Sequence, residues 1–244
     1  MRAAQQDGLL AVLCIFLSHR QFGPGEEYAL YPRDSQHDLE FALAEGVDVL
    51  WLPKETEVYP PGFGTELRMP ELEKALYGVV GPEVLRAQLT SVVRLIGLSR
   101  AQALYYGEQD WYKAAATRIA LGDLALPTQV LIAPTLRAED GLALGSMNAR
   151  LRPEERRSAA LIFQALQDAQ DLFTRHGESE ATRLLGRTSA ALTRIPGFRL
   201  QYVHLMDPVT LAERSRAVPG DLLMAGGYFG RTRLQDAVRL PRNE

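Results

Sequence analysis

Apolar and polar positions fall into blocks along residues 1–149, and two of these blocks are runs of mostly apolar residues. The first is Leu9–Leu17 (LLAVLCIFL), and the second is 47–53 (VDVLWLP), which ends at Pro53. Runs of this length with few polar positions are typical of parallel strands that are covered on both faces. We therefore predict two buried parallel strands in this part of the chain.

A helix is predicted between these two strands. Ser35 opens it, and Asp38 follows three residues later, which is the spacing of a capping box. Leu39 and Leu43 share its apolar face, and Gly46 is the stop signal. Strand, helix and strand thus follow one another in the order of an α/β unit.

The same alternation continues further along the chain. The elements predicted there are a helix over 82–97, a strand running into a loop over 101–110, a helix over 111–124, a strand over 128–137 and a loop over 139–148. This order predicts an α/β fold with a doubly wound parallel sheet. Ligands bind such sheets at the carboxyl ends of the strands, so the loops after Leu17, Tyr106 and Arg137 are candidate site loops.

The pattern changes after residue 150. Pro153 stands where a first-turn proline belongs, and the helix that it opens ends at His176 and Gly177. A second helix is predicted over 178–194, with strands over 199–207 and 222–230. We therefore expect two domains, an α/β domain over 1–149 and a smaller α+β carboxyl-terminal domain over 150–244. The first carries an excess of acidic residues and the second an excess of basic residues, which agrees with this division.

Composition narrows the class of protein. Apolar residues make up 46% and charged residues 23%, an ordinary balance for a globular protein. The longest apolar run is too short to span a bilayer, and one cysteine, Cys14, excludes a disulfide framework. The four histidines lack metal-ligand spacing, and the sequence has no basic tract. We expect a cytoplasmic protein with no metal site and with neither nucleic acid nor membrane as a partner.

Seven motifs occur in one order along the chain: FLSHRQFGPGEEYALYPR, GVDVLWLP, YPPGF, YYGEQD, RAEDGLALGSMN, YVHLMDPVTL and GRTRLQD. In this order they resemble the pantothenate synthetase (pantoate–β-alanine ligase) family over essentially the whole chain. The resemblance implies a Rossmann-like domain of the nucleotidyltransferase superfamily and a carboxyl-terminal lid. It also implies a ligase of coenzyme A precursor synthesis, which activates pantoate with ATP and Mg²⁺ to pantoyl adenylate and passes it to β-alanine.

Some site residues of the family have matches here. Gln21 matches a glutamine that holds pantoate, and an amide suits a hydroxy acid because it both donates and accepts hydrogen bonds. The resemblance also implies nucleotide-binding residues, which are Gly107, Glu108, Asp110, Ser146 and Asn148.

Other family positions carry different residues. The family's loop asparagine, loop arginine and loop histidine align with Ser18, Gly81 and Val84. The altered positions near the nucleotide are Gln109 for a lysine, Lys113 for a pantoate-contacting glutamine, Gly145 for a serine and Met147 for an arginine. Lys113 follows Asp110 by three residues and is expected to point away from the pocket. We predict no catalytic residue among these positions and weak binding of ATP.

These replacements leave three hypotheses open. Adenylation depends on positive charge aimed at the phosphates, and losing one such donor costs roughly 10²–10³ in rate. The chain is a pantothenate synthetase, or an inactive paralogue that binds a small acid or a partner subunit, or a divergent amide ligase that takes a preactivated acid. The first predicts AMP release, the second binding alone, and the third amide formation without ATP.

The resemblance also bears on the first strand of the sheet. In the family a strand followed by a histidine-bearing helix comes first, and MRAAQQDG aligns only with the last turns of that helix. We therefore expect domain 1–149 to lack its first strand and the Leu9–Leu17 strand to have an unpaired edge. Unpaired strand edges invite association, which leaves a homo-oligomer open.

Overall fold

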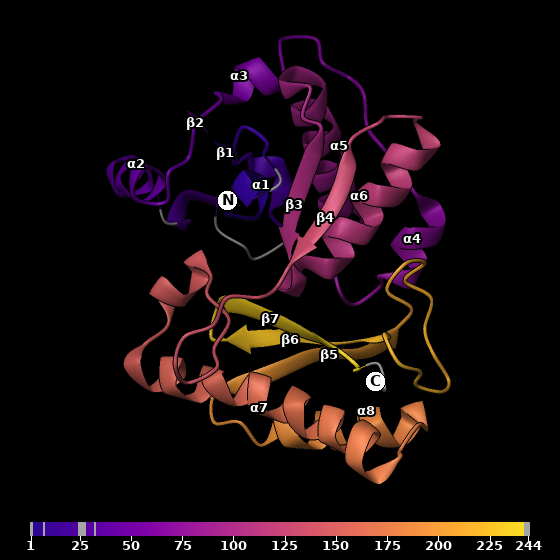
Figure 1. Ribbon diagram of the computed structural model, residues 1–244. Coiled ribbons are helices and arrows are strands. Elements are labelled where there is room, and N and C mark those ends of the chain that lie inside the picture. The colour runs from indigo at the N-terminus through magenta and orange to yellow at the C-terminus, as the bar shows by residue number, and fades with distance from the viewer. Residues whose placement is uncertain (1, 7, 24–27, 32, 242–244) are drawn as a thin grey trace.

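The computed structural model describes residues 2–6, 8–23, 28–31 and 33–241. Figure 1 shows parallel strands with helices in one part and a three-stranded sheet with two long helices in the other. The α-helices are α1 (Arg2–Gln6), α2 (Ser35–Ala44), α3 (Glu55–Val58), α4 (Pro70–Ala75), α5 (Pro82–Ser99), α6 (Trp111–Asp123), α7 (Pro153–His176) and α8 (Ala181–Thr193). The strands are β1 (Val12–Cys14), β2 (Val49–Trp51), β3 (Ala103–Gly107), β4 (Gln129–Ala133), β5 (Phe198–Met206), β6 (Leu222–Phe229) and β7 (Thr232–Arg239). Short 3₁₀ helices are η1 (His19–Gln21), η2 (Tyr28–Leu30), η3 (Glu108–Asp110) and η4 (Ser146–Arg150).

The parallel strands form two separate pairs. β1 pairs with β2 in the register Val12↔Val49, and β3 pairs with β4 in the register Ala103↔Gln129. Within the described ranges, no ladder joins the two pairs into one sheet. The fold is therefore α/β with parallel strands, followed by an antiparallel sheet at the carboxyl-terminal end.

The prediction of a fully buried strand over Leu9–Leu17 is wrong in both length and burial. β1 contains only three residues, and the side chains of Leu10 and Val12 are 77% and 50% exposed. An apolar run predicts burial only where neighbouring elements cover it. β1 has a strand partner on one edge only among the described residues, and this leaves much of the run open.

The helix predicted at Ser35 exists, but its cap lies one residue earlier. Asp34 is the N-cap, and its Oδ1 accepts a hydrogen bond from the His37 backbone N–H at 3.0 Å. Ser35 is therefore the first helical residue, and the predicted pairing with Asp38 is not used. An aspartate caps a helix as well as a serine does, and its charge also favours the helix N-terminus.

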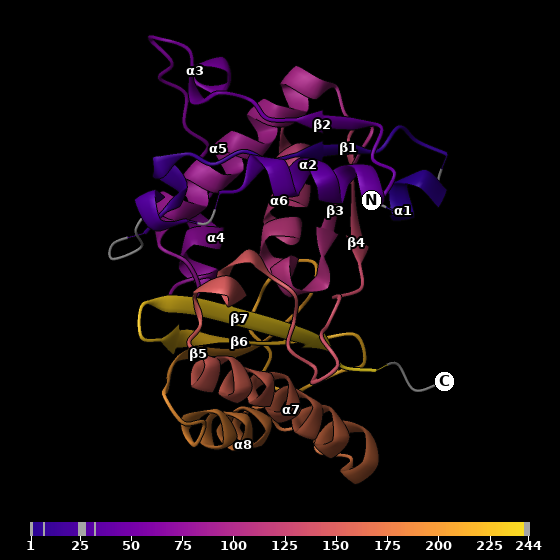
Figure 2. The same ribbon diagram turned by 90° about the vertical axis from the view of Figure 1, so that its left-hand side faces the viewer.

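The carboxyl-terminal sheet is antiparallel in the order β5-β6-β7. Figure 2 shows this sheet between the parallel strands on one side and α7 with α8 on the other. α7 begins at Pro153 and ends at His176, and Gly177 follows in the left-handed conformation with φ +65°, which confirms the predicted helix ends. β7 was not predicted, although buried and partly buried side chains alternate over its first five residues, TRLQD.

Two apolar clusters hold the sheet in place. One packs α7 and α8 against one face of the sheet, with Leu166, Leu205 and Phe229 at its centre. The other packs the opposite face onto α4, α5 and α6, with Leu222 and Met224 beside Tyr112. The second cluster draws β7 up to the start of α6, and the candidate site lies at this junction. Of the helices that the structure describes, none has the length and apolar character that crossing a membrane requires.

Candidate functional site

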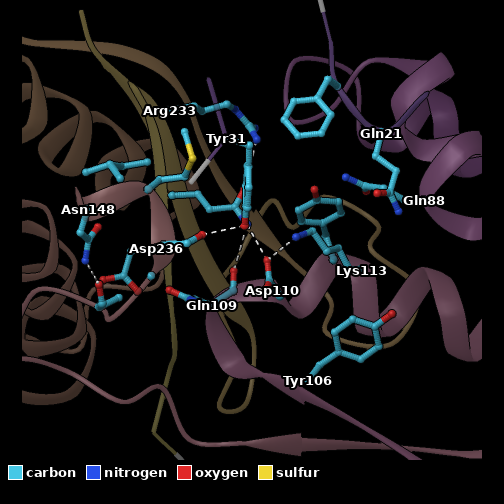
Figure 3. Close-up of a pocket in the computed structure, with 18 of the residues that line it drawn as sticks. Gln21, Tyr31, Gln88, Tyr106, Gln109, Asp110, Lys113, Asn148, Arg233 and Asp236 are labelled. Carbon is cyan, nitrogen blue, oxygen red and sulfur yellow. Dashed lines mark hydrogen bonds and ion pairs between the residues drawn. The ribbon is translucent and has the colours of Figure 1, made fainter. Parts of the chain in front are cut away.

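A cavity of about 510 Å³ lies where the carboxyl end of β3 meets α5, α6, η4 and β7. Figure 3 shows polar side chains from all of these elements around it. The predicted site residues that line it are Gln21, Gln109, Asp110, Lys113, Gly145, Ser146, Met147 and Asn148. The remaining predicted residues are Ser18, Gly81, Val84, Gly107 and Glu108, which are not part of its lining.

Gln21 enters the cavity from η1, which Ser18 caps. The Ser18 hydroxyl donates to Glu55 Oε1 at 2.6 Å, and the Arg20 backbone N–H donates to the same hydroxyl at 3.3 Å. Gln21 closes a capping box, because its Oε1 accepts from the Ser18 backbone N–H at 3.2 Å. The buried Ser18 therefore shapes the loop, and the amide nitrogen of Gln21 is the group that can donate to a ligand.

Lys113 points into the cavity, contrary to the expectation from its spacing. Its Nζ lies 2.8 Å from Asp110 Oδ1, which also accepts from Gln235 Nε2 at 3.0 Å (Figure 3). Residues three apart lie on the same face of a helical turn, so the lysine follows the aspartate instead of diverging from it. Burial acts to lower the pKa of Lys113, but the charge of Asp110 outweighs it and the pKa lies above its ordinary value. The cavity thus holds an ammonium group that is paired with Asp110.

Gln109 is fixed by the loop that follows β4. Its backbone N–H donates to Thr135 Oγ1 at 3.1 Å, and its Nε2 donates to the Leu144 carbonyl at 3.3 Å. Gly107 ends β3, and the half-buried Glu108, which lies within electrostatic reach of Arg239, is not part of the lining. Burial raises the pKa of Glu108 above its usual value. In the segment after β3, Gln109 and Asp110 therefore line the cavity, whereas Glu108 does not.

η4 brings the next set of predicted residues to the cavity. The Ser146 hydroxyl lies 2.7 Å from the hydroxyl of Tyr31, the residue that follows η2, and this contact links η4 to η2. Asn148 Nδ2 donates to the Ala143 carbonyl at 2.9 Å and closes the turn before η4. Met147 packs against the carboxyl-terminal apolar cluster. These three side chains thus hold the rim of the cavity together, and none of them is charged.

Gly81 and Val84 belong to the framework of α5. Gly81 is its N-cap residue, and Val84 is buried in the cluster formed with α4 and α6. The position that aligns with a loop histidine is therefore part of the apolar core.

A buried ion pair lies beside the cavity and was not singled out from the sequence. Arg137 Nη1 and Nη2 donate to Asp236 Oδ2 and Oδ1 at 2.6 and 3.0 Å, and the guanidinium carbon lies 3.5 Å from the Phe163 ring centroid. Burial raises the pKa of Asp236, and the hydrogen bonds from Arg137 oppose this shift. The pair ties the loop after β4 to β7. Arg137 lies within RAEDGLALGSMN and Asp236 within GRTRLQD, so the motifs contained the signal but not the pairing.

The cavity also gains cations from residues that the sequence analysis missed. Arg150 lines it from η4, and Arg231 and Arg233 line it from the β6–β7 hairpin. Together with Lys113 they make the lining suitable for an anionic ligand. No group of three or more His, Cys, Asp or Glu residues suited to a metal ion occurs in the part of the chain that the structure describes.

Comparison with known proteins places these features in one family. The sequence model of the family described as "Pantoate-beta-alanine ligase" matches residues 1–239. The pantothenate synthetase of Acidiphilium cryptum is 38% identical over 239 residues, which are 98% of this chain and 84% of that protein. The pantothenate synthetase of Moorella thermoacetica is 35% identical over 243 residues, with 100% and 86% covered.

Solved structures agree with the sequence comparison. The crystal structure of pantothenate synthetase from Thermus thermophilus superposes with a TM-score of 0.91 at 35% identity and covers 98% of this chain and 87% of that chain. A pantoate-beta-alanine ligase from Francisella tularensis, complexed with "Beta-gamma ATP" and β-alanine, superposes with a TM-score of 0.76 at 25% identity, with 98% and 82% covered.

Proposed function

The chain belongs to the pantoate-beta-alanine ligase family, and we propose that its cavity serves the pantothenate synthetase reaction, which joins pantoate and β-alanine with ATP through pantoyl adenylate. The observation that carries this proposal is that Gln21, Asp110 and η4 meet around one cavity. These elements come from three separate motifs, and each follows the end of a strand run. Their convergence supports a site for a small hydroxy acid beside a nucleotide.

Two side chains are suited to hold pantoate. The amide nitrogen of Gln21 can donate to a hydroxyl or a carboxylate, and the Lys113 ammonium group can attract the carboxylate. Asp110 holds Lys113 in place at 2.8 Å, so the ammonium group has a fixed position. The acid would then lie with its carboxylate toward the cationic side of the cavity.

The cations from η4 and the hairpin are suited to the phosphates of ATP. Arg150, Arg231 and Arg233 line the cavity, whereas Gln109 and Met147, two lining positions that align with cationic family residues, are neutral. ATP supplies the adenylyl group that activates the carboxylate, and Mg²⁺ enters with the phosphates because magnesium is bound mainly through them. We propose that Gly145 and Ser146 contact the nucleotide through backbone and hydroxyl groups.

We propose that the two parallel strand pairs are parts of a doubly wound, Rossmann-like sheet, and this arrangement agrees with the proposed function. The segments that follow β1 and β3 both line the cavity, α5 lies between the two pairs in sequence, and α6 connects β3 with β4. In such sheets the ligand lies beyond the carboxyl ends of the strands, where η1 and η3 are found here.

The test is product formation with ATP, Mg²⁺, pantoate and β-alanine. We expect AMP and pantothenate in equal amounts, and AMP only when pantoate is present. Gln21→Ala is expected to lower the rate roughly 10²-fold, since removing one positioned donor has that effect. Gln164→Ala is the matched control, because Gln164 lies on the exposed face of α7 and bonds Asp168. Absence of both products would contradict the proposal.

A second candidate is an acid-binding paralogue without ligase activity. Its support is that Val84 is part of the core and that Gln109 and Met147 are neutral, so three positions that bear positive charge or histidine in the family do not bear it here. This candidate predicts that calorimetry detects pantoate binding while no AMP forms. Pantothenate formed from supplied pantoyl adenylate, but not from pantoate and ATP, would instead indicate the divergent amide ligase.

A further inference from the structure

One wall of the cavity is formed by α5 through Gln88, Ser91, Val92 and Leu95. Two of these residues are polar, and their hydrogen bonding differs. The Ser91 hydroxyl donates to the Ala87 carbonyl at 2.6 Å and lies 2.6 Å from the Tyr59 hydroxyl, which donates to it. Ser91 is thus satisfied within the protein.

Gln88 is the other polar residue of this wall, and its side-chain hydrogen bonding is incomplete among the described residues. Its Oε1 is buried and has no hydrogen-bond partner among the residues that the structure describes. Val92 and Leu95, which follow it on the same face of α5, have no group that could donate to it. Buried acceptors without partners are rare and call for a specific explanation.

Turning the amide over does not remove the problem. A reversed Gln88 would present its N–H₂ group in place of the oxygen, and the apolar neighbours on α5 do not accept hydrogen bonds either. A methionine would fit the same space without any polar atom. The amide is therefore suited to a partner that is not part of this chain.

The neighbourhood of Gln88 indicates what that partner is. Figure 3 shows the side chains of Gln88 and Gln21 next to each other, with Lys113 close by. Since Gln21 Oε1 is engaged by Ser18, its amide nitrogen faces outward as a donor, and Gln88 offers an acceptor. A hydroxyl group both donates and accepts, so it can satisfy the two amides at once. The nearby ammonium group suits a carboxylate on the same molecule.

We propose that Gln88 determines specificity by accepting a hydrogen bond from a hydroxyl group of the bound acid, whose carboxylate is held by Lys113. The inference rests on the proposed function because the acid in question is pantoate, and it adds the residue that selects a hydroxy acid. An acid of the same shape without hydroxyl groups leaves Gln88 unpaired. Sites built to bond a hydroxyl reject such analogues.

Calorimetry on the full chain without ATP tests the proposal. The probes are pantoate and 3,3-dimethylbutanoate, which has the same branched carbon skeleton without hydroxyl groups. We expect the wild-type protein to prefer pantoate. Gln88→Met should weaken pantoate binding about tenfold, as expected for a lost hydrogen bond, and should change 3,3-dimethylbutanoate binding less than about twofold. Gln164→Met makes the same chemical change on the exposed face of α7 and should change neither affinity.

Thermal unfolding without ligand separates this role from a structural one. Gln88→Met should leave the Tm unchanged or raise it, because the substitution removes a buried acceptor that has no partner. Unchanged pantoate affinity in Gln88→Met would overturn the proposal, and so would an equal loss for both acids or wild-type protein that binds neither acid. Gln88-dependent binding of pantoate without AMP release would overturn the proposed ligase activity alone.

Discussion

Arg137 and Asp236 show how a single contact joins distant parts of the chain. The two residues are 99 positions apart and form two parallel hydrogen bonds at 2.6 and 3.0 Å, with side chains 17% and 5% exposed. Removing one partner of such a pair leaves the other charge buried without compensation, which is the expensive outcome for a buried ion pair. The pair therefore contributes to the stability of the fold as well as to the geometry of the site.

Arg137→Met is expected to lower the free energy of unfolding by about 3–5 kcal/mol, measured by urea denaturation. Adding Asp236→Asn should restore part of this loss, because it removes the uncompensated carboxylate and keeps an acceptor for the Ala237 backbone N–H. Lys74→Met is the control. It breaks the exposed pair with Glu71 and should cost less than about 1 kcal/mol. If Arg137→Met lowered the free energy of unfolding as little as Lys74→Met does, the buried pair would contribute nothing to stability.

Asp207 gives the stability a predictable dependence on pH. Its Oδ1 accepts from the backbone N–H groups of Thr210 and Val209 at 2.8 and 2.9 Å, and these bonds, with Arg214 nearby, hold its pKa below the ordinary value of 3.8. A lowered carboxyl pKa contributes stability above about pH 3.8, and this contribution is lost as the pH falls through the lower folded-state value. Asp207→Asn should therefore lower the Tm at pH 7, and the difference from wild type should shrink as the pH falls below about 4. A difference that stays constant as the pH is lowered would refute this account.

A single residue of the site could be predicted from the sequence only where it belongs to a recognisable motif. Gln21 and Asp110 were predicted from the sequence because they stand in motifs that resemble site loops of the family. Gln88 was not, because one glutamine on an amphipathic helix is an ordinary surface residue until the structure shows its buried oxygen. Lys113 was placed wrongly, since its direction depends on where α6 begins and on its ion pair with Asp110.

At the scale of elements, two glycines in β6 allow β5 and β6 to approach each other closely. A Cβ atom on Gly226 would lie 2.5 Å from the Tyr202 ring, and one on Gly227 would lie 2.5 Å from the Arg199 carbonyl oxygen. The strands can approach this closely only because these positions lack side chains. The glycine pair therefore serves the close packing of the two strands.

Gly227→Ala is expected to lower the free energy of unfolding by about 2–4 kcal/mol, because the backbone of β5 must move to admit the methyl group. Gly186→Ala is the matched control. Gly186 lies inside α8 with no atom within 4 Å of the added Cβ, and the substitution should stabilise the protein by up to about 1 kcal/mol. Chemical denaturation of both variants measures the contrast. Equal effects would show that the close approach of the strands is unimportant.

Elements with strong local signals were predictable, and elements defined by partners were not. α7 carries a first-turn proline and a glycine stop, so both of its ends follow from the sequence. β7 has charged residues between its apolar ones and is a strand because β6 pairs with it along eight positions. β1 is shorter and more exposed than its apolar run suggests, because pairing and cover come from other segments.

At the scale of the whole molecule, the second apolar cluster packs the two halves of the chain against each other. It combines Leu76 and Leu85 from the first half with Met206 and Leu222 from the second. The division into domains at residues 149 and 150 stays a prediction, because this cluster crosses it. The same packing brings β7 to the cavity, so site and core depend on one junction.

The open edges of the parallel pairs have a consequence for association. β1 pairs only with β2, and β3 only with β4, among the residues that the structure describes. Apolar side chains surround the first pair, where Leu10 is 77%, Val12 50% and Val49 46% exposed. Unpaired strand edges with apolar neighbours are templates for pairing with another chain. We therefore predict that copies of this chain associate through the β1–β2 pair.

Sedimentation velocity over a range of protein concentrations tests this prediction. The wild-type chain should shift to dimers or larger species as the concentration rises. Leu10→Lys combined with Val12→Lys should return it to a monomer, because charged side chains on a strand edge oppose pairing with a second strand. Leu136→Lys is the control, since Leu136 is 74% exposed but lies outside the β1–β2 pair, and it should leave the association unchanged. A wild-type chain that stays monomeric and monodisperse would show that these edges are tolerated in water, and an equal effect of Leu136→Lys would place the contact elsewhere on the molecule.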